Sequence, residues 1–159
     1  MKKTIVSIPE HLKPRSANTG RLFSSQFLEI LTRTHISIPV TIHLFIVACV
    51  SYYALALHTL LNFALLFLLG TLTWTLAEYC VHRFVYHTKT KKKWWLTIQH
   101  LGHGIHHQYP LDPTRLAMPP LPALVLAAGF FAFFWLLMRQ YSIAFFPGFL
   151  FGYVLYISL

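Results

Sequence analysis

The stretch IPVTIHLFIVACVSYYALAL (residues 38–57) contains no Asp, Glu, Lys or Arg. At about 1.5 Å of rise per residue, a helix of this length spans roughly 30 Å, which is the thickness of the hydrocarbon core of a bilayer. The stretch therefore predicts a helix that crosses a membrane once.

The rest of the chain agrees with this prediction. Of its 159 residues, 56% are hydrophobic and only 11% are charged, which is far from the average of soluble proteins. Further apolar runs cover residues 60–77, 121–138 and 143–159. We expect an all-α integral membrane protein with four transmembrane helices in two hairpins. Residues 1–20, which are polar and contain prolines, are predicted to be flexible, and residues 21–159 to form the membrane domain.

The positions of the basic residues predict the orientation in the membrane. One group precedes the first apolar run and a second fills the polar segment after the second run: Lys2, Lys3, Lys13, Arg15, Arg21 and Arg33, then Arg83, Lys89, Lys91, Lys92, Lys93 and Arg115. The positive-inside rule places both groups on the cytoplasmic face, near anionic headgroups. This distribution argues against nucleic acid as a partner, which the net charge of +9 alone would suggest. A bacterial inner membrane and the endoplasmic reticulum both fit.

Three residues inside the apolar runs need an interpretation. Cys49 and Cys80 both fall in apolar stretches, so they are predicted to be free, buried thiols and not a disulfide framework. His43 lies inside the first run, where an ionisable residue is a functional candidate by default. We favour a neutral imidazole that hydrogen-bonds a backbone carbonyl.

Two histidine clusters, HRFVYH (residues 82–87) and HGIHH (residues 103–107), point to a metal site. His103, His106 and His107 stand at i, i+3 and i+4, so on a helix they share a face and can converge on one or two metal ions. His82 and His87 are five residues apart, which is about 140° on an α-helix. We therefore expect these two to flank the site or to lie where the helix ends.

The surroundings of the clusters leave the metal open. Glu78 lies four residues before His82 and could accept its ring N–H, as carboxylates beside metal-binding histidines do. Histidine ligation suits zinc, copper, nickel and iron alike. The sequence has no HExxH, G-x-S-x-G, glycine-rich phosphate loop or dinucleotide fingerprint.

Three segments carry a resemblance to a known family. TLAEYCVHRFVYH (75–87), HGIHHQYPLDPTRLAMPPLPA (103–123) and FGYVLY (151–156) resemble the fatty acid hydroxylase superfamily, and within it the fatty acid 2-hydroxylase branch. The resemblance implies four membrane helices beneath a cytoplasmic histidine-rich cap, a di-iron centre, and O2-dependent hydroxylation of a lipid acyl chain by an oxidoreductase of lipid metabolism. It also implies an external electron donor. The ligands carried over are His82, His87, His103, His106 and His107.

The chain departs from the family after Tyr156. In the family the last helix continues through an acidic residue into two further histidine clusters, whereas Ile157, Ser158 and Leu159 follow here. We therefore expect a member truncated at its C-terminus, with an incomplete cap that does not build the catalytic centre by itself. Ligands from another chain, for instance in a homo-oligomer, would be one way to complete it.

Two other functions stay open on the sequence. The chain could be a non-catalytic membrane metal-binding protein that uses its five histidines for a single ion, and zinc is then a natural occupant. It could also be a structural membrane protein whose histidines bind nothing. Metal content per chain separates the three.

Overall fold

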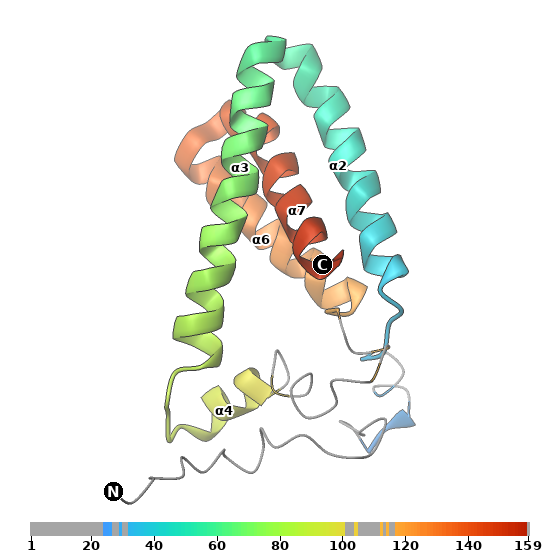
Figure 1. The fold of residues 1–159 in the computed structure, drawn as a ribbon, viewed down its shortest axis with the longest axis vertical. Helices are drawn as coiled ribbons and strands as arrows, with labels where there is room; N and C mark the ends of the chain where they lie inside the picture. Colours follow the sequence, from blue (N-terminus) through green and yellow to red (C-terminus); the bar gives the residue numbers. More distant parts are fainter. Residues whose placement is uncertain are drawn as a thin grey trace, which may run out of the picture.

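In the computed structural model, the described residues are 24–26, 29, 32–100, 104, 112, 114 and 117–158. They form helices without strands: α2 (Ser37–Leu57), α3 (Leu60–Cys80), η2 (Val81–Tyr86), α4 (Lys93–Gln99), α6 (Pro120–Met138), η4 (Arg139–Tyr141) and α7 (Ser142–Ser158). The four long helices form a bundle, with α4 at one end of it (Figure 1). The predicted flexible segment, residues 1–20, lies outside the described residues.

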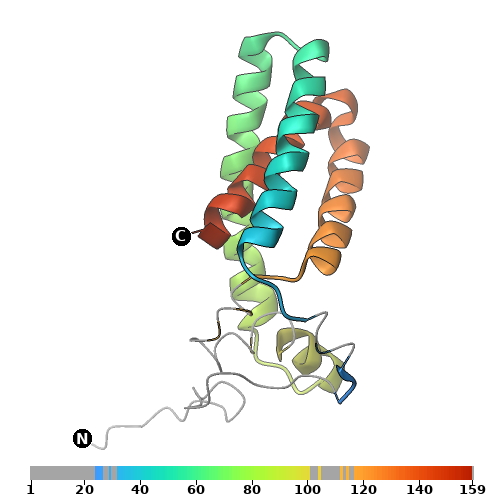
Figure 2. The same cartoon turned by 90° about the vertical axis from the view of Figure 1, so that its right-hand side faces the viewer.

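The two sharp turns of the bundle lie at the same end, opposite α4 (Figure 2). One turn joins α2 to α3, where the Thr59 hydroxyl accepts a hydrogen bond from the Asn62 N–H at 3.3 Å and caps α3. The other is η4, where Arg139 has a positive φ of 49°. The two turns touch, because His58 Nε2 lies 3.3 Å from the Gln140 carbonyl oxygen. The chain therefore reverses direction both after α2 and after α6, as two hairpins require (Figure 1 and Figure 2).

The structure contains fewer separate candidates for membrane-spanning helices than the four apolar runs predicted. In the described part of the chain, three continuous helical runs are long and apolar enough to span a membrane: Ser37–Leu57, Leu60–Tyr86 and Pro120–Ser158. The last run includes both α6 and α7, because η4 joins them without an intervening loop even though the chain turns back at Arg139. These helices are those of an integral membrane protein, and the four crossings stay a prediction.

The helix α7 forms the centre of the bundle and packs mainly on α3 and α2. Three glycines permit a close approach to α3, since a Cβ at Gly70 would lie 2.8 Å from Phe149 N, and one at Gly152 would lie 2.6 Å from Trp74 Cβ. A Cβ at Gly148 would overlap the Phe67 carbonyl oxygen. Small residues at such contacts let helix backbones approach and gain van der Waals contact, the main source of helix association in lipid.

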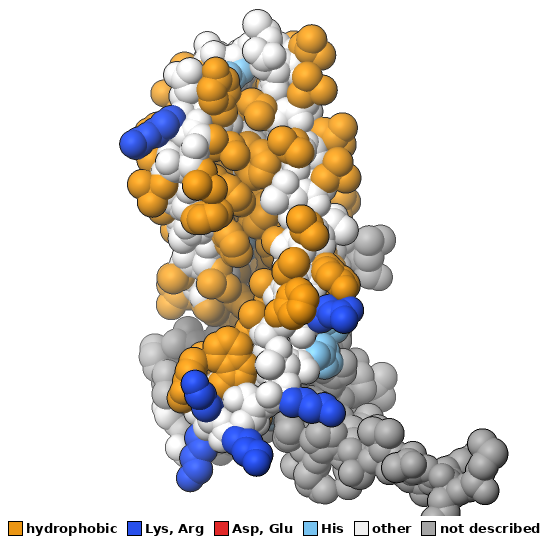
Figure 3. All heavy atoms as spheres, turned by 90° about the vertical axis from the view of Figure 1, so that its left-hand side faces the viewer, with side chains coloured by type: hydrophobic (Ala, Val, Ile, Leu, Met, Phe, Trp, Pro, Cys, Tyr) orange, Lys and Arg blue, Asp and Glu red, His pale blue; other side chains and the backbone are white. Residues whose placement is uncertain are grey.

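Aromatic side chains fill the space around α7. Phe134 of α6 packs edge-on against Phe145 and Phe149, with ring centroids 4.8 and 5.0 Å apart. The outer faces of the bundle are covered instead by exposed leucines and aromatic residues, as Figure 3 shows for one side. This outward apolar surface corrects one prediction. Cys49 and Cys80 are free thiols as expected, but Cys49 is exposed and Cys80 half-buried, because apolar positions of a membrane helix face lipid as well as the core.

Candidate metal centre

The first histidine cluster lies where α3 passes into the π-helix η2. The α-helix continues without a break through Val81, and the wider turn of η2 closes with a hydrogen bond from the His87 N–H to the His82 carbonyl at 3.1 Å. A π-helix repeats its hydrogen bonds at i, i+5, so residues five apart come to the same face. The ring centroids of His82 and His87 are 4.5 Å apart, with their planes tilted by 45°.

The prediction for His82 and His87 had two parts, their angular separation on the helix and their position at the helix end. The 140° separation expected from an α-helix is wrong, because the π-turn removes it. The expectation that the pair lies where the helix ends is right, since η2 ends at Tyr86 and His87 follows directly. Two imidazoles bound to one ion at about 2.1 Å keep their ring centroids roughly 4.5–5.5 Å apart. The two rings are in direct contact at the end of η2, and their role as metal ligands stays a prediction.

Gln99, at the end of α4, holds this turn from outside. Its side-chain amide donates to the carbonyl oxygens of Val85, at 2.7 Å, and Thr88, at 2.8 Å, on either side of His87. The residue is 8% exposed. Carbonyls at the end of a helix lack partners within it, so one buried amide satisfies two of them and links α4 to the histidine pair. Sequence reasoning missed Gln99, since a glutamine before a histidine cluster carries no signal by spacing alone.

The second cluster lies mostly beyond what the structure describes. His103, His106 and His107 fall outside the described residues, so their predicted convergence on His82 and His87 stays a prediction. Within the described residues, no group of three or more His, Cys, Asp or Glu side chains is placed to hold an ion. Gly104 is buried beside His100, because a Cβ there would lie 3.1 Å from His100 Nδ1.

Glu78 connects α3 to α7 just below the histidine pair. The Glu78 carboxylate lies close to the Tyr156 hydroxyl of α7 and interacts with it electrostatically. This partner was not expected from the sequence, which puts the two residues far apart. The predicted bond between Glu78 and the ring of His82 stays a prediction. The proximity of Glu78 to Tyr156 brings the base of the turn that carries His82 and His87 next to the central helix.

His43 behaves as the sequence suggested. It is 1% exposed, and its Nδ1 lies 2.7 Å from the Pro39 carbonyl oxygen in the preceding turn of α2. Its ring packs edge-on against Tyr153 of α7, with ring centroids 4.9 Å apart. The predicted contact of the His43 ring with a backbone carbonyl is confirmed, and His43 contributes to packing between α2 and α7.

Comparison with known proteins gives a consistent set of relatives. The chain is 41% identical to a dihydroceramide fatty acyl 2-hydroxylase of Arabidopsis thaliana over 138 residues, covering 86% of this chain and 58% of that protein. It is 43% identical to the fatty acid 2-hydroxylase of Rattus norvegicus over 95 residues, covering 57% of this chain and 25% of that protein. No protein-family model matches.

A yeast relative and a solved structure extend the similarity over more of this chain. A ceramide very long chain fatty acid hydroxylase of Schizosaccharomyces pombe is 37% identical over 156 residues, covering 93% of this chain and 43% of that protein. A structure described as full-length scs7p, with only its hydroxylase domain visible, matches with a TM-score of 0.84 and 34% identity, covering 93% of this chain and 58% of that one. The chain spans at most about 58% of the length of these relatives.

The resemblance expected from the histidine segments is confirmed: the homologues of this chain are fatty acid 2-hydroxylases and ceramide hydroxylases.

Proposed function

We propose that this chain is part of a membrane-bound hydroxylase of lipid acyl chains, of the fatty acid 2-hydroxylase type. The observation that carries the proposal is the pairing of His82 and His87 by the π-turn, in a chain whose homologues are such hydroxylases. The proposed ligands are His82, His87, His103, His106 and His107. Two iron ions held by these histidines would supply the O2-dependent oxidation of an acyl C–H bond.

The described residues would prepare this site in three ways. The π-turn orients both imidazoles before any ion arrives, since His82 and His87 already share one face. Gln99 keeps the turn closed by bonding the carbonyls beside His87. Glu78 lies close to Tyr156 and so brings the base of the turn next to α7. Ligands that are preorganised in this way lose less conformational entropy on binding.

The substrate and its surroundings follow from the apolar bundle. An acyl chain is apolar, so it would lie against the membrane helices and present the carbon beside its carboxyl group at the end where the histidines lie. We propose that four helices cross the membrane in two hairpins with the histidines on the cytoplasmic side, as the basic residues predict. Electrons come from an external donor.

The test is metal content per purified full chain, measured by elemental analysis in detergent together with the oligomeric state. About two iron atoms per chain would support a di-iron site built by this sequence or shared between copies. A single ion that persists in a monomer, and is lost in the double variant His82→Ala, His87→Ala, would favour the non-catalytic metal-binding protein. No metal after loading with either iron or zinc would overturn the metal site for this chain.

A further inference from the structure

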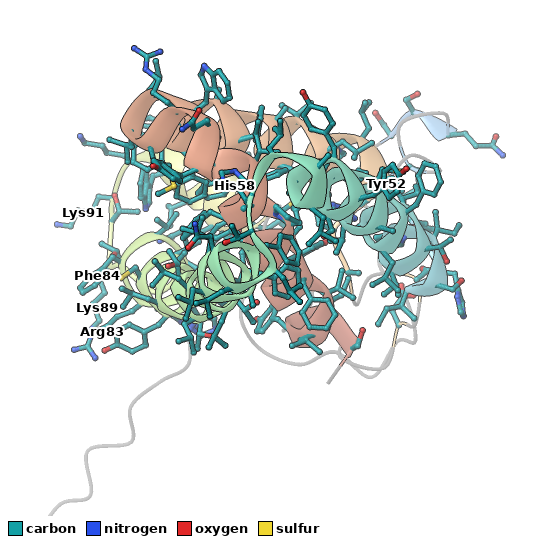
Figure 4. The ribbon with its side chains drawn as sticks, turned by 90° about the horizontal axis from the view of Figure 1, so that it is seen from above. Tyr52, His58, Arg83, Phe84, Lys89 and Lys91 are labelled. Atoms are coloured by element: carbon teal, nitrogen blue, oxygen red, sulfur yellow. The ribbon has the colours of Figure 1, made fainter. Side chains whose placement is uncertain are left out.

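We propose that the outer surface where η2 meets α4 docks on the anionic phospholipid headgroups of the membrane. This headgroup surface consists of Arg83, Phe84, Lys89, Lys91, Lys92, Lys93, Trp94 and Ile98. Figure 4 shows Arg83, Phe84, Lys89 and Lys91 along one edge of the molecule. Figure 3 shows hydrophobic side chains bordered by basic ones at the end of the bundle that carries α4. The proposal requires neither a bound metal nor hydroxylase activity.

The charge of the headgroup surface has no counterpart within the described part of the chain. From residue 60 to residue 100 the sequence holds five Lys and Arg but one acid, Glu78, which lies close to Tyr156 of α7. None of the four lysines between residues 89 and 93 forms an ion pair with a described carboxylate. An anionic partner therefore complements this surface.

Arg83 is held on the outside of the bundle by aromatic neighbours. Its guanidinium donates to the Tyr79 hydroxyl at 2.9 Å and lies 5.8 Å from the ring centroids of both Tyr79 and Phe84. Both aromatic side chains are exposed, Phe84 by 60%. This contact holds the Arg83 charge beside two exposed rings at the edge of the molecule (Figure 4).

The depth of the surface matches the headgroup layer. Leu60 to Arg83 is a continuous helical stretch, which rises about 35 Å at 1.5 Å per residue, whereas the hydrocarbon core is about 30 Å thick. A helix that enters the core at Leu60 therefore brings Arg83 just past its far boundary. Lysine and arginine side chains at this level attract anionic lipid.

The apolar part of the surface favours a lipid bilayer over a soluble acidic protein. Trp94 is 57% exposed and Ile98 is 46% exposed on α4, and they lie one turn apart on the same face. Trp95 is half-buried beneath them and packs edge-on against Trp94, with ring centroids 5.1 Å apart. Tryptophan is enriched at the membrane interface, where an apolar ring and a polar N–H are both accommodated.

The experiment uses the full chain reconstituted in vesicles of phosphatidylcholine with about 30% phosphatidylglycerol. The phosphatidylglycerol gives the vesicle surface the negative charge of an anionic leaflet. In one sample the phosphatidylcholine is brominated and in the other the phosphatidylglycerol, because brominated lipid quenches the fluorescence of nearby tryptophans. The quenching that is lost in the variant Trp94→Phe is the contribution of Trp94. We expect stronger quenching by the brominated anionic lipid. The triple variant Lys91→Gln, Lys92→Gln, Lys93→Gln should lower the preference for anionic lipid about fivefold per lysine.

Two control variants keep the result interpretable. Replacing the same three lysines by arginine keeps the charge and should keep the preference, whereas Arg139→Gln, in the turn at the opposite end of the bundle, should leave it unchanged. Equal quenching by both lipids in the original chain would overturn anionic recognition. Quenching of Trp94 by neither lipid would place α4 away from the membrane, and would overturn the proposal in favour of a soluble partner.

Discussion

Gly148 of α7 lies directly against the backbone of Phe67 in α3, so closely that a Cβ at position 148 would overlap the Phe67 carbonyl oxygen. The contact joins the central helix to the helix that leads into the histidine pair. The position of that pair in the bundle therefore depends on a residue without a side chain, far from it in the sequence.

Replacing Gly148 by alanine should separate α3 from α7. We expect a loss of about 1–3 kcal/mol in the free energy of unfolding, the usual cost of overpacking, because backbone atoms on both sides of the contact would have to move. Thermal unfolding in detergent measures the change. Gly129→Ala is the matched control, since a Cβ there meets nothing within 4 Å, and it should be neutral or slightly stabilising. Equal effects of the two substitutions would contradict the close contact.

The Thr71 hydroxyl contributes a polar contact at the same interface. It lies 3.0 Å from the Gly148 carbonyl oxygen and 3.0 Å from that of Phe67 in its own helix. Thr71→Val keeps the shape but removes the donor, and should cost about 0.6–2 kcal/mol, as interhelical hydrogen bonds in membranes do. Thr73→Val should have almost no effect, because the Thr73 hydroxyl bonds only Leu69 in its own helix. Unfolding by denaturant compares the two variants.

Gln99→Leu should loosen the π-turn without removing a histidine. The carbonyls of Val85 and Thr88 would lose a donor, at a cost of about 0.5–1.5 kcal/mol for each partly buried hydrogen bond. We expect metal affinity to fall about 10- to 100-fold, the range seen when residues that orient metal ligands are removed. Isothermal titration calorimetry with zinc measures this change in metal affinity. Gln140→Leu, at an exposed position in the opposite turn, is the control; an unchanged affinity in Gln99→Leu would show that Gln99 does not position the pair.

Removing the metal should lower stability only when both paired histidines are present. A ligand that binds the native state alone stabilises it by mass action, so chelation should lower the unfolding temperature of the metal-loaded chain. The variants His82→Ala and His87→Ala should show a much smaller shift on chelation. His58→Ala, at the opposite end of the bundle, should respond as the original chain does. If His82→Ala and His87→Ala both showed the same shift in unfolding temperature as the original chain, neither histidine would be a metal ligand.

Hydrophobic patterning was sufficient to predict the long helices. The apolar runs start within one residue of α2, α3, α6 and α7, because a helix that faces lipid must be apolar along its whole length. Patterning did not show that α3 continues as the π-helix η2 or that α4 exists. The turn of η2 is accompanied by tertiary contacts from Gln99, and such contacts leave no period in the sequence.

For the site, the sequence indicated candidate residues but not the contacts between them. His82 and His87 were chosen as ligands by residue type and family resemblance, which stays a prediction, and their contact depends on backbone geometry that an α-helical projection cannot represent. Tyr156 and Glu78 meet across two helices that are joined only by the folded bundle. Contacts of this kind follow from helix packing, which the sequence of each helix alone does not determine.

The central position of α7 has a consequence for biosynthesis. The helices α2 and α3 are neighbours in the chain, yet both pack chiefly on α7 and barely on each other. A ribosome releases α7 last of the described helices, so the first two helices enter the bilayer with their inner faces still in contact with lipid. The interior of this protein is therefore completed only after synthesis of its final described helix, when a single late step brings all of these surfaces together.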